Sequence, residues 1–134
     1  MMIPVMNKES TAQELANLSW LLDELKISCE DPNLRWKIAQ LASKAEELHE
    51  KFLDEFNLHP LSPLKHYKEL SAKLSANERI EALLSFAFQS GAMMDYARYE
   101  QFDPGEEFQD KIKSITKETL RLLHEKRGWR SEDD

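Results

Sequence analysis

Residues 82–97 read ALLSFAFQSGAMMDYA and carry one formal charge, that of Asp95, in a chain in which 32% of the residues are charged. Apolar side chains fall on every side of a helical projection of this stretch, a pattern typical of a helix that other helices surround. Ala87 and Gly91 are four residues apart and place two small residues on one face, where a neighbouring helix can approach closely. The sequence therefore predicts a buried central helix around which the other elements pack.

Length and composition favour a single domain, residues 1–134, that is large enough to bury a core without metals or disulfides. The net charge of −7 is opposite in sign to that of a typical nucleic-acid-binding protein, and it favours a basic partner. Cys29 is the only cysteine, which indicates a reducing compartment. The N-terminal residues lack the pattern of a secretory signal, and the stretch 82–97 is too short to span a membrane. We therefore expect a cytoplasmic protein.

Periodic apolar residues predict a helical hairpin in the first half of the chain. Thr11 and Glu14 have the spacing of a capping box. The helix that follows carries an apolar stripe made of Leu15, Leu18, Leu22, Leu25 and Cys29. Asp31 and Pro32 favour the start of a second helix. This helix covers about 33–57, and its stripe is Leu34, Ile38, Leu41, Ala45, Leu48, Phe52 and Phe56. Because only a short turn separates the two helices, we expect them to be antiparallel.

The second half of the chain predicts three further helices: a short one over 64–74, the central one over about 77–101, and a final one after Asp103 and Pro104. Ser75 or Asn77 is expected to provide the N-cap of the central helix. The final helix has a predicted buried stripe of Phe108, Ile112, Ile115, Thr119, Leu122 and Leu123.

The predicted fold class is all-α: a single-domain bundle of four long helices plus one short helix, mainly up-and-down, with the helix at about 77–101 as the most buried element. Residues 1–9 are expected to form a loose leader and residues 129–134 a frayed tail. No segment alternates between apolar and polar residues over the length of a strand, so no sheet is predicted. The sequence leaves open whether 64–74 and 77–101 form one helix or two.

Large apolar residues that do not fit the stripes predict a contact surface. Trp20 and Ile27 lie roughly opposite the stripe of the first helix, and Trp36 lies near the turn that follows this helix. Two acidic residues, Asp23 and Glu24, frame them. Aromatic anchors carry much of the energy of protein interfaces, so these five residues are predicted to bind a partner. The alternative is that Trp20 and Ile27 meet another element of the same domain.

The sequence contains no motif of nucleophilic or phosphate-loop chemistry. Cys29 lies on an apolar stripe, as a small core residue does. Glu46 and His49 have the i, i+3 spacing of di-iron bundles, but no second such pair is present. We therefore predict a non-catalytic protein-binding module without a cofactor: an adaptor, inhibitor, immunity-type or chaperone-like protein. Its expected partner is a protein with a basic surface or a second copy of the chain, and neither a membrane nor a nucleic acid is expected.

One motif supports an alternative, enzymatic function. Glu78 and Glu81, followed by Glu100 and Asp103, give the spacing ExxE…ExxD, which resembles the motif of the MazG-like all-α nucleotide pyrophosphohydrolases. The resemblance implies magnesium-dependent nucleotide hydrolysis, with these four carboxylates holding Mg²⁺ beside a triphosphate. Carboxylates at i and i+3 share one helix face, and magnesium needs several oxygens at close range. A single metal site would require the chain to reverse direction between the two pairs.

Two further groups of residues have alternative interpretations. The polar residues of the central helix, Gln89, Ser90 and Asp95, are expected either to form hydrogen bonds between helices or to belong to a pocket. The lining of that pocket would be Phe86, Met93, Met94 and Tyr96. A basic row on the final helix, Lys113, Lys117 and Arg121, is expected either to be a solvated face or to contact phosphates or an acidic partner.

Overall fold

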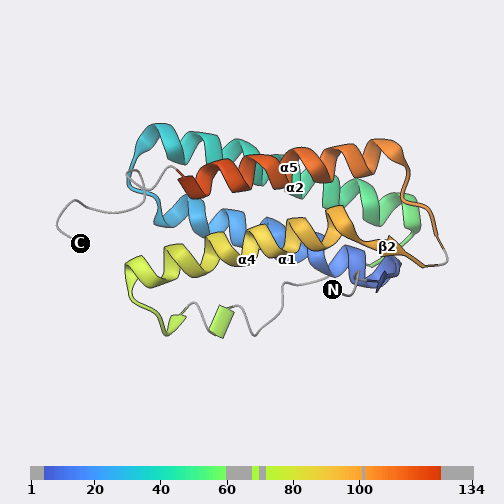
Figure 1. The fold of residues 1–134 in the computed structure, drawn as a ribbon, viewed down its shortest axis with the longest axis horizontal. Coiled ribbons are helices and arrows are strands. Elements are labelled where there is room, and N and C mark those ends of the chain that lie inside the picture. Colours follow the sequence, from blue (N-terminus) through green and yellow to red (C-terminus); the bar gives the residue numbers. More distant parts are fainter. Residues whose placement is uncertain (1–4, 60–67, 70–71, 101, 125–134) are drawn as a thin grey trace.

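The computed structural model describes residues 5–59, 68–69, 72–100 and 102–124. Within these residues the chain forms α1 (Lys8–Ser28), α2 (Pro32–Phe56), α4 (Ala76–Tyr96) and α5 (Glu106–His124), with two short strands, β1 (Val5–Met6) and β2 (Arg98–Tyr99) (Figure 1). The predicted all-α class is confirmed. Most of the predicted short helix over 64–74, and all of the predicted tail at 129–134, lie outside the described residues.

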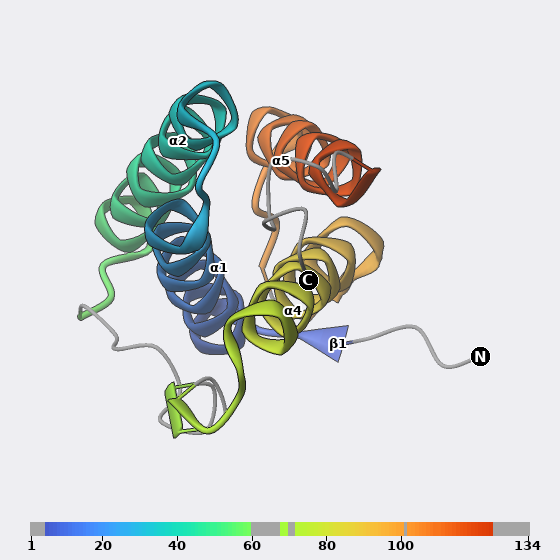
Figure 2. The same ribbon diagram turned by 90° about the vertical axis from the view of Figure 1, so that its left-hand side faces the viewer.

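The four helices form a bundle in which every neighbouring pair is antiparallel. Viewed from the end, α1 lies beside α2 and α4, and α5 completes the square diagonally opposite α1 (Figure 2). Helices α2 and α4 occupy the other diagonal and run in the same direction along the bundle (Figure 1). The connection between them therefore joins opposite ends of the bundle. The four helices form a four-helix bundle, and most of the segment that joins α2 to α4 lies outside the described residues, so the predicted mainly up-and-down order with a short helix at 64–74 stays a prediction.

The most buried helix is α1, not the predicted central helix. Ten residues of α1 are buried: Thr11, Ala12, Leu15, Ala16, Asn17, Leu18, Ser19, Leu21, Leu22 and Leu25. Helix α4 instead leaves Met93 40% and Tyr96 73% exposed. The prediction of the most buried helix was wrong because half of the buried residues of α1 are small or polar, and such residues do not contribute to an apolar stripe. Helix α1 packs against both α2 and α4.

Residues 5–9 form β1, the N-cap of α1 and the start of α1, which corrects this part of the loose leader predicted at 1–9; residues 1–4 lie outside the described residues. Asn7 is the N-cap of α1, and its side chain and that of Ser10 form the capping box predicted for Thr11 and Glu14. Thr11 is instead buried inside the helix, where its hydroxyl donates to the carbonyl of Asn7 at 2.7 Å. The helix begins earlier because Asn7 satisfies the first free amides.

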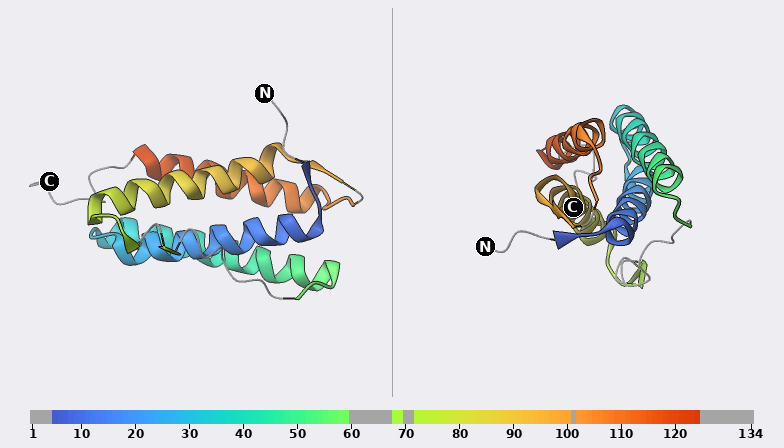
Figure 3. Two further views of the ribbon diagram at one scale, coloured as in Figure 1. Left: turned by 90° about the horizontal axis from the view of Figure 1, so that it is seen from below. Right: turned by 90° about the vertical axis from the view of Figure 1, so that its right-hand side faces the viewer.

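A short parallel ladder joins β1 to β2, with Val5 opposite Arg98 and Met6 opposite Tyr99. Strand β1 crosses from the start of α1 to the end of α4 (Figure 3). The amide of Glu100 donates to the carbonyl of Met6 at 2.8 Å. This pairing corrects both the expected absence of a sheet and the predicted end of the central helix at 101. The backbone after Tyr96 is extended because it pairs with β1.

Other predicted helix starts and stripes are confirmed. Asp31 caps α2 with Pro32 in its first turn, and Ser75 caps α4 through a capping box with Glu78. The final helix starts slightly later than predicted, because Asp103 accepts the amide of Gly105 at 2.9 Å and Gly105 adopts φ +90°. Core residues from the predicted stripes include Leu15, Leu18, Leu22, Leu25, Cys29, Leu34, Ile38, Leu41, Leu48, Phe52, Phe108, Ile112, Ile115 and Leu122.

Candidate functional site

The five residues predicted to bind a partner lie at the α1–α2 hairpin but differ in exposure. Ile27 is 72% and Trp36 63% exposed. Trp20 is half-buried and packs against the core, as the alternative interpretation expected. Asp23 is exposed and forms an ion pair with Lys26 at 3.6 Å, and Glu24 is half-buried. The structure therefore leaves two large apolar side chains in solvent at this end of the bundle.

Helix geometry places these residues on two outward faces rather than one. Trp20, Glu24 and Ile27 share one face of α1, because residues three and four apart lie above one another. On α2, Trp36 is about 200° around the helix from both Leu34 and Ile38, which point into the core. The structure brings Ile27 and Trp36 to the same end of the bundle, on adjacent helices.

The turn between α1 and α2 is held by Arg35. Its guanidinium donates twice to the carbonyl of Cys29, at 3.0 Å from Nε and 2.7 Å from Nη2. The thiol of Cys29 is buried below this turn. Burial raises the pKa of the thiol, which disfavours the reactive thiolate. Cys29 is therefore a core residue, as the sequence predicted.

The carboxylate pairs of the enzymatic alternative are not brought together. Glu78 and Glu81 lie in the first turns of α4, whereas Glu100 and Asp103 follow its end. Helix α4 is continuous between them and, with 21 residues, is about 31 Å long. No group of three or more His, Cys, Asp or Glu residues in the described part of the chain is arranged to hold a metal. Within one chain, the four carboxylates cannot bind one Mg²⁺.

Two of these carboxylates have structural roles instead. The carboxylate of Glu78 accepts the amide of Ser75 at 3.2 Å, and its hydrogen bonds to the side chain and backbone of Ser75 lower its pKa. Asp103 accepts the amide of Gly105 just before α5. Both residues stabilise helix starts, where free amides attract negative charge.

A buried polar cluster lies between α1 and α4; the sequence analysis had named its member on α4, Ser90, but missed its members on α1. Asn17 and Ser90 are fully buried, and Gln13 donates to the Asn17 side chain at 3.0 Å. Burial raises the pKa of the neighbouring Glu14 carboxyl, an effect that Ser90 and Asn17 partly offset. Because Ser90 belongs to α4, Glu14 lies on the side of α1 that faces α4. Glu14 stands next to the apolar stripe of α1 in the sequence, and this position could have indicated that its side chain is partly buried. We had instead assigned Glu14 to a capping box at the start of the helix.

The other polar residues of α4 do not form the alternative pocket. Gln89 is exposed, and Asp95 is half-buried. Tyr99 donates from its hydroxyl to the carbonyl of Met94 at 2.8 Å, and burial together with the charge of Asp95 raises the pKa of Tyr99 to about 12. Of the predicted pocket residues, Met94 is buried in the core, whereas Met93 and Tyr96 face solvent.

Replacing the half-buried carboxylate tests this cluster. Because the pKa of Glu14 is raised above its ordinary 4.5, the folded state loses stability as pH rises through the folded pKa. We expect Glu14→Gln to increase the denaturation midpoint at pH 7 and to match the wild type at acidic pH, where Glu14 is protonated. Urea unfolding at a series of pH values measures both. The control is Glu78→Gln, for which the lowered pKa of Glu78 predicts a loss of stability at neutral pH. A loss of stability at neutral pH for Glu14→Gln as well would contradict the interpretation.

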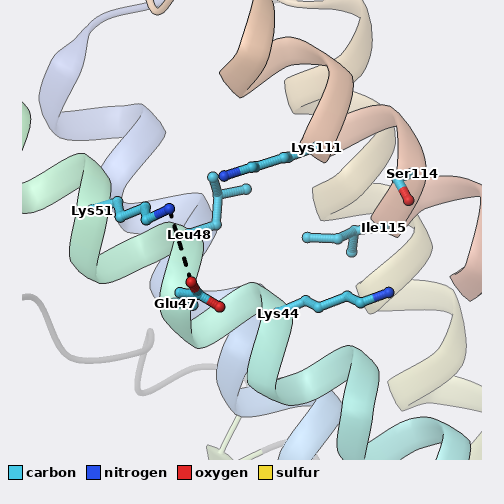
Figure 4. A pocket seen from close by; sticks show the side chains of 7 residues that line it. All are labelled: Lys44, Glu47, Leu48, Lys51, Lys111, Ser114 and Ile115. Atoms are coloured by element: carbon cyan, nitrogen blue, oxygen red, sulfur yellow. Dashed lines mark ion pairs between the residues drawn. The ribbon is translucent and has the colours of Figure 1, made fainter.

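A groove between α2 and α5 contains a cavity of about 340 Å³. Figure 4 shows its lining: Lys44, Glu47, Leu48 and Lys51 from α2, and Lys111, Ser114 and Ile115 from α5. Leu48 and Ile115 form an apolar floor, and the three lysines line the walls on both sides. No motif in the sequence indicated this groove, because its lysines come from two separate helices.

The groove continues along the bundle and changes charge on the way. At one end a cavity of about 240 Å³ adds Lys37, Gln40, Leu41, Glu118, Arg121 and Leu122 to its lining. At the other end the lining contains Asp54, Glu55, Glu106 and Glu107. The cavities of about 340 Å³ and 240 Å³ form the basic part of the groove, since together they are lined by five basic and two acidic side chains. Of the basic row predicted on the final helix, Arg121 lines the groove and pairs with Glu118 at 3.2 Å, whereas Lys113 and Lys117 are exposed outside it.

Comparisons of this chain with protein-family models, with curated proteins and with solved structures gave no match. None of the helices within the described residues combines the length and hydropathy needed to cross a lipid bilayer.

Proposed function

We propose that this protein is a non-catalytic protein-binding module whose contact surface is the α1–α2 end of the bundle. The observation that carries the proposal is the exposure of Trp36, at 63%, together with that of Ile27, at 72%. Large apolar side chains in solvent are unfavourable, and tryptophan is the residue type most enriched among interface anchors. The turn between them is fixed by Arg35, so the two side chains are presented by a rigid support.

Charge indicates the chemistry of the partner. The net charge of −7 and the nearby Asp23 and Glu24 favour a protein with a basic surface. Opposite charges increase the rate of association, while the apolar anchors supply the affinity. A second copy of the chain is the alternative partner. The proposal retains the predicted cytoplasmic location, which rests on the single cysteine.

Substitution of the two anchors tests the proposal. The variant Ile27→Ser with Trp36→Ser is expected to lose at least about thirtyfold in affinity for the partner, since truncating even one anchor residue costs about 2 kcal/mol or more. Met93→Ser is the matched control, because Met93 is also an exposed apolar residue (40%) but lies near the end of α4, at the opposite end of the bundle. Circular dichroism checks that all variants are folded.

The measurement is quantitative affinity capture from the native host, followed by titration of the captured protein against each variant. Sedimentation of the isolated protein tests the dimeric alternative. The proposal is wrong if the double variant and Met93→Ser bind the same proteins with the same affinity, or if no specific partner and no dimer is found.

A further inference from the structure

We propose that the groove between α2 and α5 is a binding site for a small phosphate-bearing ligand, held by Lys44, Lys51, Lys111 and Ser114. This site is separate from the surface proposed above. Its residues come from facing walls of one cavity, whose volume of about 340 Å³ lies at the lower end of the range for small-molecule sites.

The charges around the cavity are the first argument. Three ammonium groups and one carboxylate, that of Glu47, line it. Lys51 pairs with Glu47 at 3.8 Å and Lys111 with Glu107 at 3.3 Å, but these are exposed pairs within one helix, which contribute little. Lys44 forms no ion pair with any residue that the structure describes. The cavity therefore has an excess of positive charge in a protein whose net charge is −7.

The second argument is the arrangement of hydrogen-bond donors. The side chains of Lys51 and Lys111 reach each other across the groove (Figure 4). An ammonium group has only donors, so neither lysine can accept a hydrogen bond from the other. An oxyanion between them would supply the missing acceptors and reduce the repulsion between the two charges. Lysine binds phosphate as a point charge, and the Ser114 hydroxyl adds a donor on the α5 wall.

The third argument is the shape of the charge distribution. The basic part of the groove ends where Asp54, Glu55, Glu106 and Glu107 begin, so an extended polyanion along the whole groove would meet repulsion. A compact anion avoids these carboxylates. The apolar floor of Leu48 and Ile115 can contact a small organic group attached to the phosphate. These features favour a small phosphomonoester or diphosphate over an acidic protein segment.

Titration of the isotope-labelled protein with inorganic phosphate and with pyrophosphate, at constant ionic strength, tests the site by NMR. We expect saturable shifts at the amides of Lys44, Leu48 and Ser114, with pyrophosphate binding more tightly than phosphate. Lys44→Gln and Lys111→Gln should each weaken pyrophosphate binding by at least about tenfold, the effect of removing one charge-assisted hydrogen bond. Glu47→Gln should tighten it, because the only carboxylate of the lining is removed.

Lys113→Gln is the matched control. It removes the same charge from α5, but Lys113 is exposed outside the groove. The proposal is overturned if millimolar phosphate and pyrophosphate give no saturable shift, or if Lys113→Gln weakens binding as much as Lys44→Gln does. It is also overturned if an oligoglutamate peptide of equal charge binds the groove more tightly than pyrophosphate, since the site would then be a protein contact.

Discussion

Phe52→Ala is expected to lower the free energy of unfolding by about 3–5 kcal/mol, the range found when a large buried aromatic residue is truncated. Phe52 is 1% exposed and lies at the centre of an aromatic cluster at one end of the bundle. Its ring centroid is 4.6 Å from that of Phe56, 5.1 Å from Phe108 and 6.1 Å from Phe102. The substitution removes contacts between α2, α5 and the segment before α5 at once. Chemical denaturation monitored by circular dichroism measures the effect.

Phe56→Ala is the matched control for this prediction. Phe56 belongs to the same cluster and is in the same helix, but it is only half-buried and lies at the edge. Its truncation leaves a smaller cavity because solvent can fill the space, so its effect should be clearly smaller. Equal losses for the two variants would mean that Phe52 is not the centre of the core at this end.

Gly91→Leu is expected to destabilise the protein by about 3 kcal/mol, the upper part of the range for overpacking. A Cβ atom at Gly91 would lie 2.7 Å from Oγ1 and 3.6 Å from Cα of Thr116, so α4 and α5 are in close contact at this point. The Thr116 side chain is buried and donates to the carbonyl of Ile112 at 2.9 Å, which limits its movement. A leucine at position 91 can fit only if the two helices separate. Thermal unfolding measures the loss.

Two variants show whether the close contact is the cause. Gly91→Ala should be much milder than Gly91→Leu, because its gain in helix propensity of about 1 kcal/mol offsets part of the clash. Adding Thr116→Ala to Gly91→Ala removes the Oγ1 atom and should recover stability relative to Gly91→Ala alone. If the second substitution lowers stability further, the contact between Gly91 and Thr116 is not what limits the spacing of the helices.

Much of the fold followed from the apolar residues of the sequence. The stripes of α1, α2 and α5, the helix start at Asp31 and Pro32, the cap at Ser75, and the close approach at Gly91 were all predicted. These features depend on residues near one another in the chain, whose physical preferences can be read directly. The buried small and polar residues of α1, such as Ala16 and Asn17, carry no such signal. For this reason the prediction of which helix is most buried was wrong.

Features that depend on distant contacts could not be predicted from the sequence. The diagonal placement of α2 and α4 depends on how the whole bundle packs, not on either helix alone. The groove requires Lys44 and Lys51 to face Lys111, and nothing local relates these residues. Helix periodicity placed Trp36 outside the core stripe of α2 correctly, but only the coordinates show that no described element covers it.

The ladder between β1 and β2 has a consequence for the order of folding. Its two strands come from either side of α1, α2 and α4 in the sequence, so the chain loses considerable freedom when they meet. Each strand has only two residues, so the hydrogen bonds of the ladder offset little of this loss of chain entropy. We therefore expect the ladder to form after the helices have assembled and to open before them in the native state. A fusion tag attached before Val5 would therefore disturb the ladder between β1 and β2 and leave the assembly of the helices unaffected.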